Sequence, residues 1–140
     1  MPKIVLTDTC YWLGLIDAED QHHDSSVTVS ELINDYRIVI PWPCLYETIS
    51  TRLARNYERL TIFETFLKKP GIELLDDGKY RNAALNEVFE FNRNNGHTFS
   101  LVDSVIREML KDIDLWVNYF VTFNVRDFHD VCAKRQIEII

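Results

Sequence analysis

The sequence lacks paired cysteines, a long apolar run and an excess of positive charge, and each absence excludes a class of protein. Its three cysteines, Cys10, Cys44 and Cys132, are isolated and odd in number, which argues against a disulfide framework and favours a reduced compartment. No apolar stretch approaches the length of a membrane span, and the N-terminal residues lack the apolar run of a secretory signal. We therefore expect a cytoplasmic protein that does not enter a membrane.

The formal net charge of −7 limits how the protein could bind nucleic acid. A protein that coats RNA through electrostatics alone is normally basic, so the acidic balance counts against that function. It does not count against an enzyme that gathers carboxylates at a metal site, because bound ions invert the local charge. The 46% hydrophobic and 26% charged content is typical of a folded globular chain, and 140 residues predict a single domain over residues 1–140.

Short apolar segments alternate with segments of helical spacing along the whole chain. The pattern predicts strands at residues 3–6, 37–40, 72–75, 116–122 and 137–140. It predicts helices at residues 9–16, 25–34, 57–68, 80–92 and 101–111, a turn or helix at 125–135, and one helix after Pro43 that carries Leu45, Ile49 and Leu53. Strands separated by more than hairpin distance predict an α/β fold with a parallel sheet and helices on both faces.

Three acidic residues follow or face the ends of predicted strands. Asp8 comes at the end of the first strand, Glu47 lies in the helix after the second strand, and Asp103 lies near the start of a helix that Ser100 caps. The segment 122–127 leaves the fourth strand. Because ligand sites in open parallel sheets form outside the carboxyl ends of the strands, we expect these side chains to share one edge.

Each of the three acids has apolar neighbours in the sequence, which indicates a carboxylate that is held by a partner or works with a cation. Carboxylates that converge without a cation repel one another and raise their own pKa values. A hard divalent ion relieves this repulsion, and oxygen ligands suit Mg²⁺ or Mn²⁺ better than zinc. Taken singly, however, Asp8 could cap the next helix, Glu47 could be solvated, and Asp103 could cap its helix or pair with Arg107.

Four segments of the chain resemble the PIN-domain family, and more narrowly its small VapC-like members. They are IVLTDT at residues 4–9, YE at 46–47, SLVDS at 100–104 and VTFNVRDF at 121–128. The resemblance runs over nearly the whole chain, and it rests on the order and spacing of the segments. It implies a three-layer PIN-like fold with about five parallel strands. It also implies an Mg²⁺- or Mn²⁺-dependent endoribonuclease that acts on RNA, often the toxin of a toxin–antitoxin pair, with an antitoxin partner and a homodimeric assembly.

The resemblance also assigns roles to individual residues. Asp8, Glu47 and Asp103 match the family's three most regular acidic positions, and they are the candidate catalytic residues and metal ligands. Asn124 stands where many members have aspartate, and Asp127 follows it, so these two are weaker candidate ligands and one firmly held ion is the expectation. The residues expected to orient water or contact substrate phosphates are Thr7, Thr9, Ser100, Thr122, Arg52, Arg55, Arg107 and Arg126.

Two other functions compete with the nuclease. A PIN-like binding or scaffold module with an incomplete site is favoured by Asn124, while the complete set of Asp8, Glu47 and Asp103 argues against it. A metal-dependent phosphohydrolase of the haloacid-dehalogenase type would need a second aspartate two residues after the first. Cys10 occupies that position, so this alternative is weaker.

Overall fold

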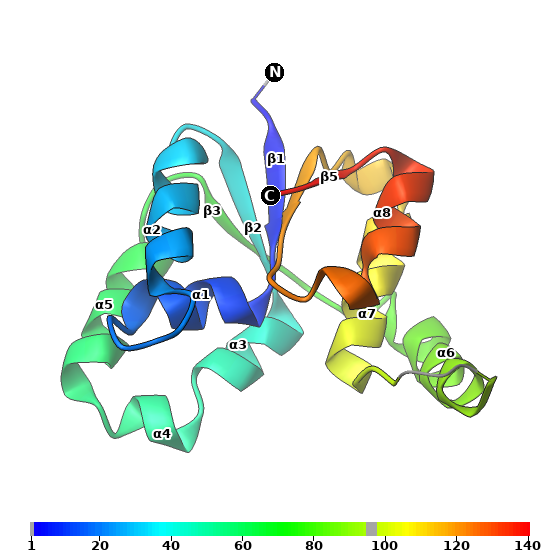
Figure 1. Ribbon diagram of the computed structural model, residues 1–140, viewed down its shortest axis with the longest axis horizontal. Helices are drawn as coiled ribbons and strands as arrows, with labels where there is room; N and C mark the ends of the chain where they lie inside the picture. Colours follow the sequence, from blue (N-terminus) through cyan, green and yellow to red (C-terminus); the bar gives the residue numbers. More distant parts are fainter. Residues whose placement is uncertain (1, 95–97) are drawn as a thin grey trace.

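The computed structural model describes residues 2–94 and 98–140, which form a five-stranded parallel sheet between two layers of helices (Figure 1). The strands lie in the order β3-β2-β1-β4-β5. Their bounds are β1 Ile4–Thr7, β2 Arg37–Pro41, β3 Ile72–Leu75, β4 Tyr119–Val121 and β5 Glu138–Ile139. The predicted α/β class, the number of strands and their parallel direction are confirmed.

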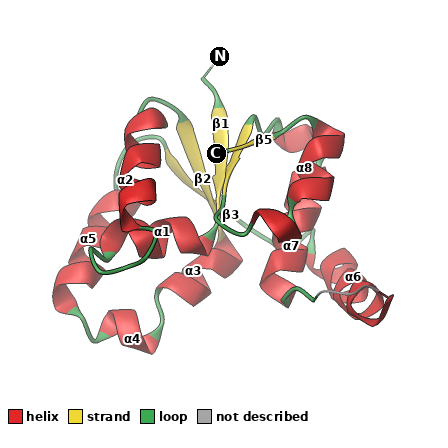
Figure 2. Ribbon diagram, viewed as in Figure 1, coloured by secondary structure: helices red, strands yellow, loops and turns green. Residues whose placement is uncertain are grey.

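Figure 2 shows helices α1, α2 and α5 on one side of the sheet and α6, α7 and α8 on the other. The helices are α1 Thr9–Ile16, α2 His23–Leu32, α3 Trp42–Thr48, α4 Thr51–Ala54, α5 Tyr57–Leu67, α6 Arg81–Asn94, α7 Leu101–Lys111 and α8 His129–Arg135, with 3-10 turns η1 Ile113–Leu115 and η2 Val125–Asp127. None of the described helices is both long and apolar enough to cross a bilayer.

The core forms on both faces of the sheet around β1 and β4. Leu6 of β1 and Phe120 of β4 are fully buried, as are Ile106 and Leu110 of α7. On the opposite face the ring of Trp12 lies 5.7 Å from that of Phe63 in α5, centroid to centroid. Continuous apolar strands of this kind fit a parallel sheet covered on both sides, because each side chain meets a helix layer.

The strand order reverses at β1, which makes its carboxyl end the place for a ligand site. Helices α1 to α5 connect the strands on the β2 and β3 side, and the chain then crosses to β4 and β5. The backbone N–H of Asp8 donates to the carbonyl of Val121 at 3.0 Å, so the chain ends of β1 and β4 are joined directly. A crevice outside the carboxyl ends at such a reversal is the usual ligand position in open α/β sheets.

The single helix predicted after Pro43 is wrong, because the chain forms two short helices, α3 and α4, in its place. Ser50 has an extended backbone, with φ −77° and ψ 169°, and its side chain accepts a hydrogen bond from the backbone N–H of Leu53. Ser50 therefore begins a new helix, as serine favours at an N-cap. Ile49, expected on the buried face, is exposed at the break.

The fourth strand is also shorter than predicted. Trp116 follows the turn η1 with a left-handed backbone, φ 54° and ψ 36°, which no strand residue can have. The strand therefore begins at Tyr119 instead of residue 116. The helix predicted over residues 80–92 instead continues to Asn94 as α6, although the polar residues 92–97 favour a loop, and residues 95–97 lie outside the described part.

Helices α1 and α2 approach each other closely at Gly14. A Cβ atom placed on Gly14 would lie 2.5 Å from Oγ of Ser26 and 3.2 Å from the backbone oxygen of His22. The Ser26 hydroxyl is fixed in that position because it donates to the carbonyl of Tyr11 at 3.0 Å. Only a residue without a side chain fits between the two helices here.

We predict that Gly14→Ala destabilises the fold by about 1–3 kcal/mol, since the added methyl forces the two helices apart. Urea unfolding followed by circular dichroism measures the loss. Gly78→Ala is the control, because its added Cβ would meet only the end of the exposed Asp76 side chain, which can turn away at the cost of one exposed hydrogen bond. Equal effects of the two substitutions would contradict a packing constraint at Gly14.

Candidate functional site

Asp8 lies at the centre of the candidate site, buried at the end of β1. Its Oδ1 accepts a hydrogen bond from the backbone N–H of Thr9 at 2.8 Å, so it does cap helix α1. Its Oδ2 accepts one from the hydroxyl of Thr122 at 2.8 Å and one from the Cys10 thiol at 3.6 Å. Burial raises the pKa of Asp8, these three hydrogen bonds lower it in part, and the charge of Asp127 raises it again.

Glu47 reaches the same edge from helix α3. The hydroxyl of Thr9 donates to its Oε1 at 2.6 Å, which connects the start of α1 to α3. Desolvation of the carboxyl raises the pKa of Glu47, the Thr9 hydrogen bond opposes that shift, and the charge of Asp8 adds to it. Glu47 therefore lies in the electrostatic field of Asp8, as its place after β2 predicted.

Asp103 approaches from the other helix layer, at the third position of α7. Ser100 and Asp103 form a capping box, in which the Ser100 hydroxyl accepts from the backbone N–H of Asp103 at 3.1 Å. The pKa of Asp103 is raised to about 6, chiefly by burial and further by the charges of Asp8, Asp127 and Glu47, while the hydrogen bond with the Ser100 backbone opposes the shift. The three predicted acids thus interact with one another, although they come from three separate elements.

The segment after β4 completes this edge of the sheet. The backbone N–H of Asn124 donates to the Thr122 hydroxyl at 3.0 Å. The side-chain amide of Asn124 donates to the carboxylate of Asp127, which is buried. The Asn124 side chain is therefore held by Asp127, and its amide oxygen is the atom that could face an ion.

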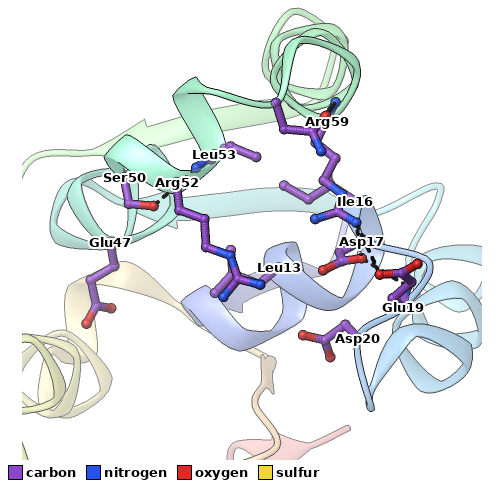
Figure 3. Close-up of a pocket in the computed structure, with 11 residues that line it drawn as sticks. Leu13, Ile16, Asp17, Glu19, Asp20, Glu47, Ser50, Arg52, Leu53 and Arg59 are labelled. Carbon is purple, nitrogen blue, oxygen red and sulfur yellow. Dashed lines mark hydrogen bonds and ion pairs between the residues drawn. The ribbon is translucent and has the colours of Figure 1, made fainter.

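A shallow groove of about 540 Å³ opens over Asp8 and Glu47. It is lined by Asp8, Thr9, Cys10, Leu13, Tyr46, Glu47, Ser50 and Asn124. A second recess of about 400 Å³ continues from it, because Leu13, Glu47 and Ser50 line both. Figure 3 shows Arg52 extending over this recess toward α1, while Arg59 is tied to Asp17 and Glu19.

The predicted substrate contacts fall into two groups. Three of the four hydroxyls hold other groups of the fold or site: Thr7 donates to the carbonyl of Val39, Thr9 to Glu47 and Thr122 to Asp8. Ser100, the fourth, caps α7. The arginines Arg52, Arg55 and Arg126 are exposed, and of these Arg52 lines the recess beside Glu47.

Arg107 does not fit the role predicted for it, whether as a phosphate contact or as a partner of Asp103. Its side chain is buried and donates to both carboxylate oxygens of Asp130, at 2.7 and 2.8 Å. It also donates to the backbone carbonyl of Asp127 at 2.8 Å. Arg107 therefore anchors the segment after β4 against α7. Its spacing of four residues from Asp103 pointed to a different partner, and no local signal in the sequence indicated Asp130.

The donor chemistry at this edge fits a hard divalent cation. Carboxylate and amide oxygens predominate. Burial raises the pKa of Asp103 and the charges of Asp8, Asp127 and Glu47 add to the shift, which a bound cation would oppose. The geometry is less complete: among the described residues, no group of three or more His, Cys, Asp or Glu side chains converges as a formed metal cluster. Each carboxylate instead accepts local hydrogen bonds, so coordination of one ion by all three would require their side chains to turn.

Comparison with known proteins found similarity in structure alone. No family model matches the sequence, and no curated protein matches it. The toxin VapC20 of Mycobacterium tuberculosis, described as cleaving the sarcin–ricin loop, superposes with a TM-score of 0.64 and 14% identity over 90% of this chain and 94% of that one. VapBC2 of Rickettsia felis, bound to a DNA fragment from its promoter, gives a TM-score of 0.63 and 20% identity over 98% and 97%.

These superpositions cover nearly the full length of each chain, so they concern the whole fold and not one motif. The protein has the PIN-like α/β fold. Its fold is like that of these two solved structures, as the four sequence segments predicted. At 14% and 20% identity the likeness describes the fold, and the functions of the two proteins are properties of those proteins.

We predict that Asp103→Asn stabilises the ion-free protein above about pH 6. The folded state raises the pKa of Asp103 to about 6, from about 3.9 in an unfolded chain, so it binds more protons between these values. Stability therefore falls as pH rises through that window, and the asparagine removes the loss. Allowing for solvent screening at a partly exposed carboxyl, the gain is of order 1 kcal/mol.

Urea unfolding in EDTA at about pH 4 and about pH 8 measures the effect, which should be present only at the higher pH. Asp35→Asn, at an exposed carboxylate between α2 and β2, is the matched control. If Asp103→Asn destabilises the protein equally at both pH values, the carboxyl is only a helix cap. In a separate measurement, added Mg²⁺ should raise the free energy of unfolding of the wild type and should have a smaller effect on Asp103→Asn.

Proposed function

We propose that the protein is an Mg²⁺- or Mn²⁺-dependent endoribonuclease that hydrolyses RNA phosphodiesters. One observation carries the proposal: Asp8, Glu47 and Asp103 arrive from the end of β1, α3 and α7 at one edge of the sheet. There the charge of Asp8 adds to the burial that raises the pKa of Glu47, and the charges of Asp8 and Glu47 add to the burial that raises the pKa of Asp103. The VapC-like fold supports it, since one of its structural neighbours is described as an RNA-cleaving toxin. We place this activity in the cytoplasm, in agreement with the three free cysteines.

Asp8 and Asp103 would hold the ion, with Glu47 completing the ligand set and Asn124 and Asp127 beside them. A bound ion of this type lowers the pKa of a coordinated water and stabilises the charge that develops on a phosphodiester. The protein's own contribution is the orientation of the ligands. Thr122 and Thr9 fix the carboxylates of Asp8 and Glu47 through hydrogen bonds, as outer groups commonly do at metal sites.

The RNA strand would lie in the groove over Asp8 and continue into the recess beside Glu47. Arg52 lines that recess, so it is the best-placed phosphate contact. Arg55 and Arg126 are exposed and line neither the groove nor the recess, so they would contact phosphates beyond the part of the strand that lies there. The Ser100 hydroxyl accepts one hydrogen bond in its helix cap, so it would still be able to donate its own hydrogen to substrate or water.

We predict that Asp8→Asn lowers the rate of RNA cleavage by roughly 10²-fold or more, because the substitution removes the negative charge and one of the two oxygens of a proposed metal ligand. The assay follows a structured RNA in Mg²⁺, in Mn²⁺ and in EDTA, and EDTA should abolish wild-type cleavage. Asp35→Asn, which removes the same charge at an exposed site, should cleave as the wild type does.

Circular dichroism of each variant shows whether the fold is intact. A folded wild type that cleaves no RNA in either metal would contradict the nuclease and favour the scaffold alternative that Asn124 suggested. Equal cleavage by the wild type and Asp8→Asn would mean that any activity comes from elsewhere.

The proposal includes an inhibitory protein partner of the antitoxin type. Support comes from the Rickettsia felis neighbour, which is a VapBC2 assembly on promoter DNA. An extended or helical segment of such a partner would lie in the groove lined by Asp8, Glu47 and Asn124 and exclude RNA from it. A basic side chain on that segment would suit the acidic floor of the groove.

The proposal also includes a homodimer, formed through the apolar side chains of α6 and the start of α7. Leu85, Phe89 and Leu101 are each about half exposed there, and apolar side chains gathered on a surface often mark a contact with another protein.

We predict that Leu85→Glu lowers the molar mass in light scattering from that of a dimer to that of a monomer. Leu32→Glu, on α2 in the opposite layer, is the control and should leave the mass unchanged. A monomeric wild type would contradict the dimer.

A further inference from the structure

Tyr46 is a large aromatic side chain that the fold leaves in solvent beside the acids. Its side chain is 75% exposed, although its neighbours on α3, Cys44 and Leu45, are buried in the core. It immediately precedes Glu47 and lines the groove that contains Asp8 and Asn124. In the described part of the chain it is the single aromatic residue that lines this groove.

The helix that carries Tyr46 is held firmly. Pro43 lies in its first turn, where the fixed proline φ favours a helix. The Trp42 ring lies 6.3 Å from the Tyr46 ring, centroid to centroid, and is tilted by 46°. Tyr46 contributes little to the core of the chain. Besides the acidic groove it also lines a recess that contains Leu85 and Leu101 of the proposed dimer surface, so the test below includes the molar mass.

We propose that Tyr46 is the stacking platform for a nucleobase next to the scissile phosphate. The inference rests on the proposed ribonuclease function and identifies a substrate-positioning residue of the same site. One nucleotide of the strand would place its phosphate over Asp8 and Glu47 and its base against the ring of Tyr46. Every base has a π-face, so this contact recognises single-stranded RNA without a strong sequence preference.

Charge explains why a neutral contact is needed here. The protein carries a net charge of −7, and carboxylates form the floor of the groove. A polyanion therefore gains little from long-range attraction, and its phosphates are repelled until a cation is present. Stacking on an aromatic ring contributes affinity that depends only weakly on salt and does not require the ion.

The chain offers a matched control for this role. Tyr57, at the start of α5, is 82% exposed and lines neither the acidic groove nor the recess beside it. Tyr46→Ala and Tyr57→Ala remove the same side chain from equally exposed positions, so both variants should fold. Tyr46→Phe keeps the ring and removes only the hydroxyl.

The experiment measures the binding of a fluorescently labelled single-stranded RNA in EDTA, and the KM and kcat of its cleavage in Mg²⁺. We expect Tyr46→Ala to weaken binding and raise KM by about 5- to 150-fold, the range that loss of one base stack gives, with a smaller effect on kcat. Tyr46→Phe and Tyr57→Ala should remain within about twofold of the wild type. The loss in Tyr46→Ala should persist at high salt, whereas that in Arg52→Ala should shrink.

The results separate this inference from the proposed function. A wild type that binds RNA but does not cleave it contradicts the nuclease, while the binding data still test Tyr46. Unchanged RNA binding in Tyr46→Ala overturns the stacking role. So does an equal loss in Tyr46→Phe, which would assign the effect to the hydroxyl. A change of molar mass in Tyr46→Ala would make Tyr46 an interface residue and would overturn the inference as well.

Discussion

The hydrogen bond from Thr122 to Asp8 is the contact on which the rest of the site depends. It joins the residue after β1 to the residue after β4, at the point where the strand order reverses. With the Thr9 backbone N–H on the other oxygen, it orients a buried carboxylate that would otherwise be costly to ionise. Glu47 is then placed through Thr9, and the segment up to Asp127 through Thr122. The functional edge is thus a property of the sheet and not of any one loop.

The accumulation of carboxylates at this edge opposes folding in the absence of a cation, and other contacts offset it. Arg107 is the main one: it holds the backbone of Asp127 from within α7 while both oxygens of Asp130 neutralise its charge. The pair lines a different recess from the groove, so it holds the backbone of Asp127 without supplying a positive charge in the groove. The site therefore keeps its negative potential, which is the condition for binding a cation from solution.

Local signals in the sequence explain which parts of the fold could be predicted. The bounds of α1 and α7 were predicted correctly because Asp8 and Ser100 are N-caps, whose geometry involves only near neighbours. The break between α3 and α4 was missed, because a serine is also found inside helices and the sequence does not reveal that the backbone of Ser50 is extended. Arg107 was misassigned because Asp130 lies 23 residues away in sequence and meets it only through the packing of α7 on α8. The exposure of Tyr46 likewise depends on tertiary packing.

The arrangement of the site suggests how an acidic protein could select RNA that is already single-stranded. A base can stack on Tyr46 only when it has left its own stack, so the contact favours loops over duplexes. The groove is shallow, which leaves room for a folded loop over Asp8. Asn124 reduces the negative charge at the far side, where a phosphate would lie after stacking has placed the strand. One firmly held ion, with any second ion brought by the substrate phosphate, is consistent with that lower charge.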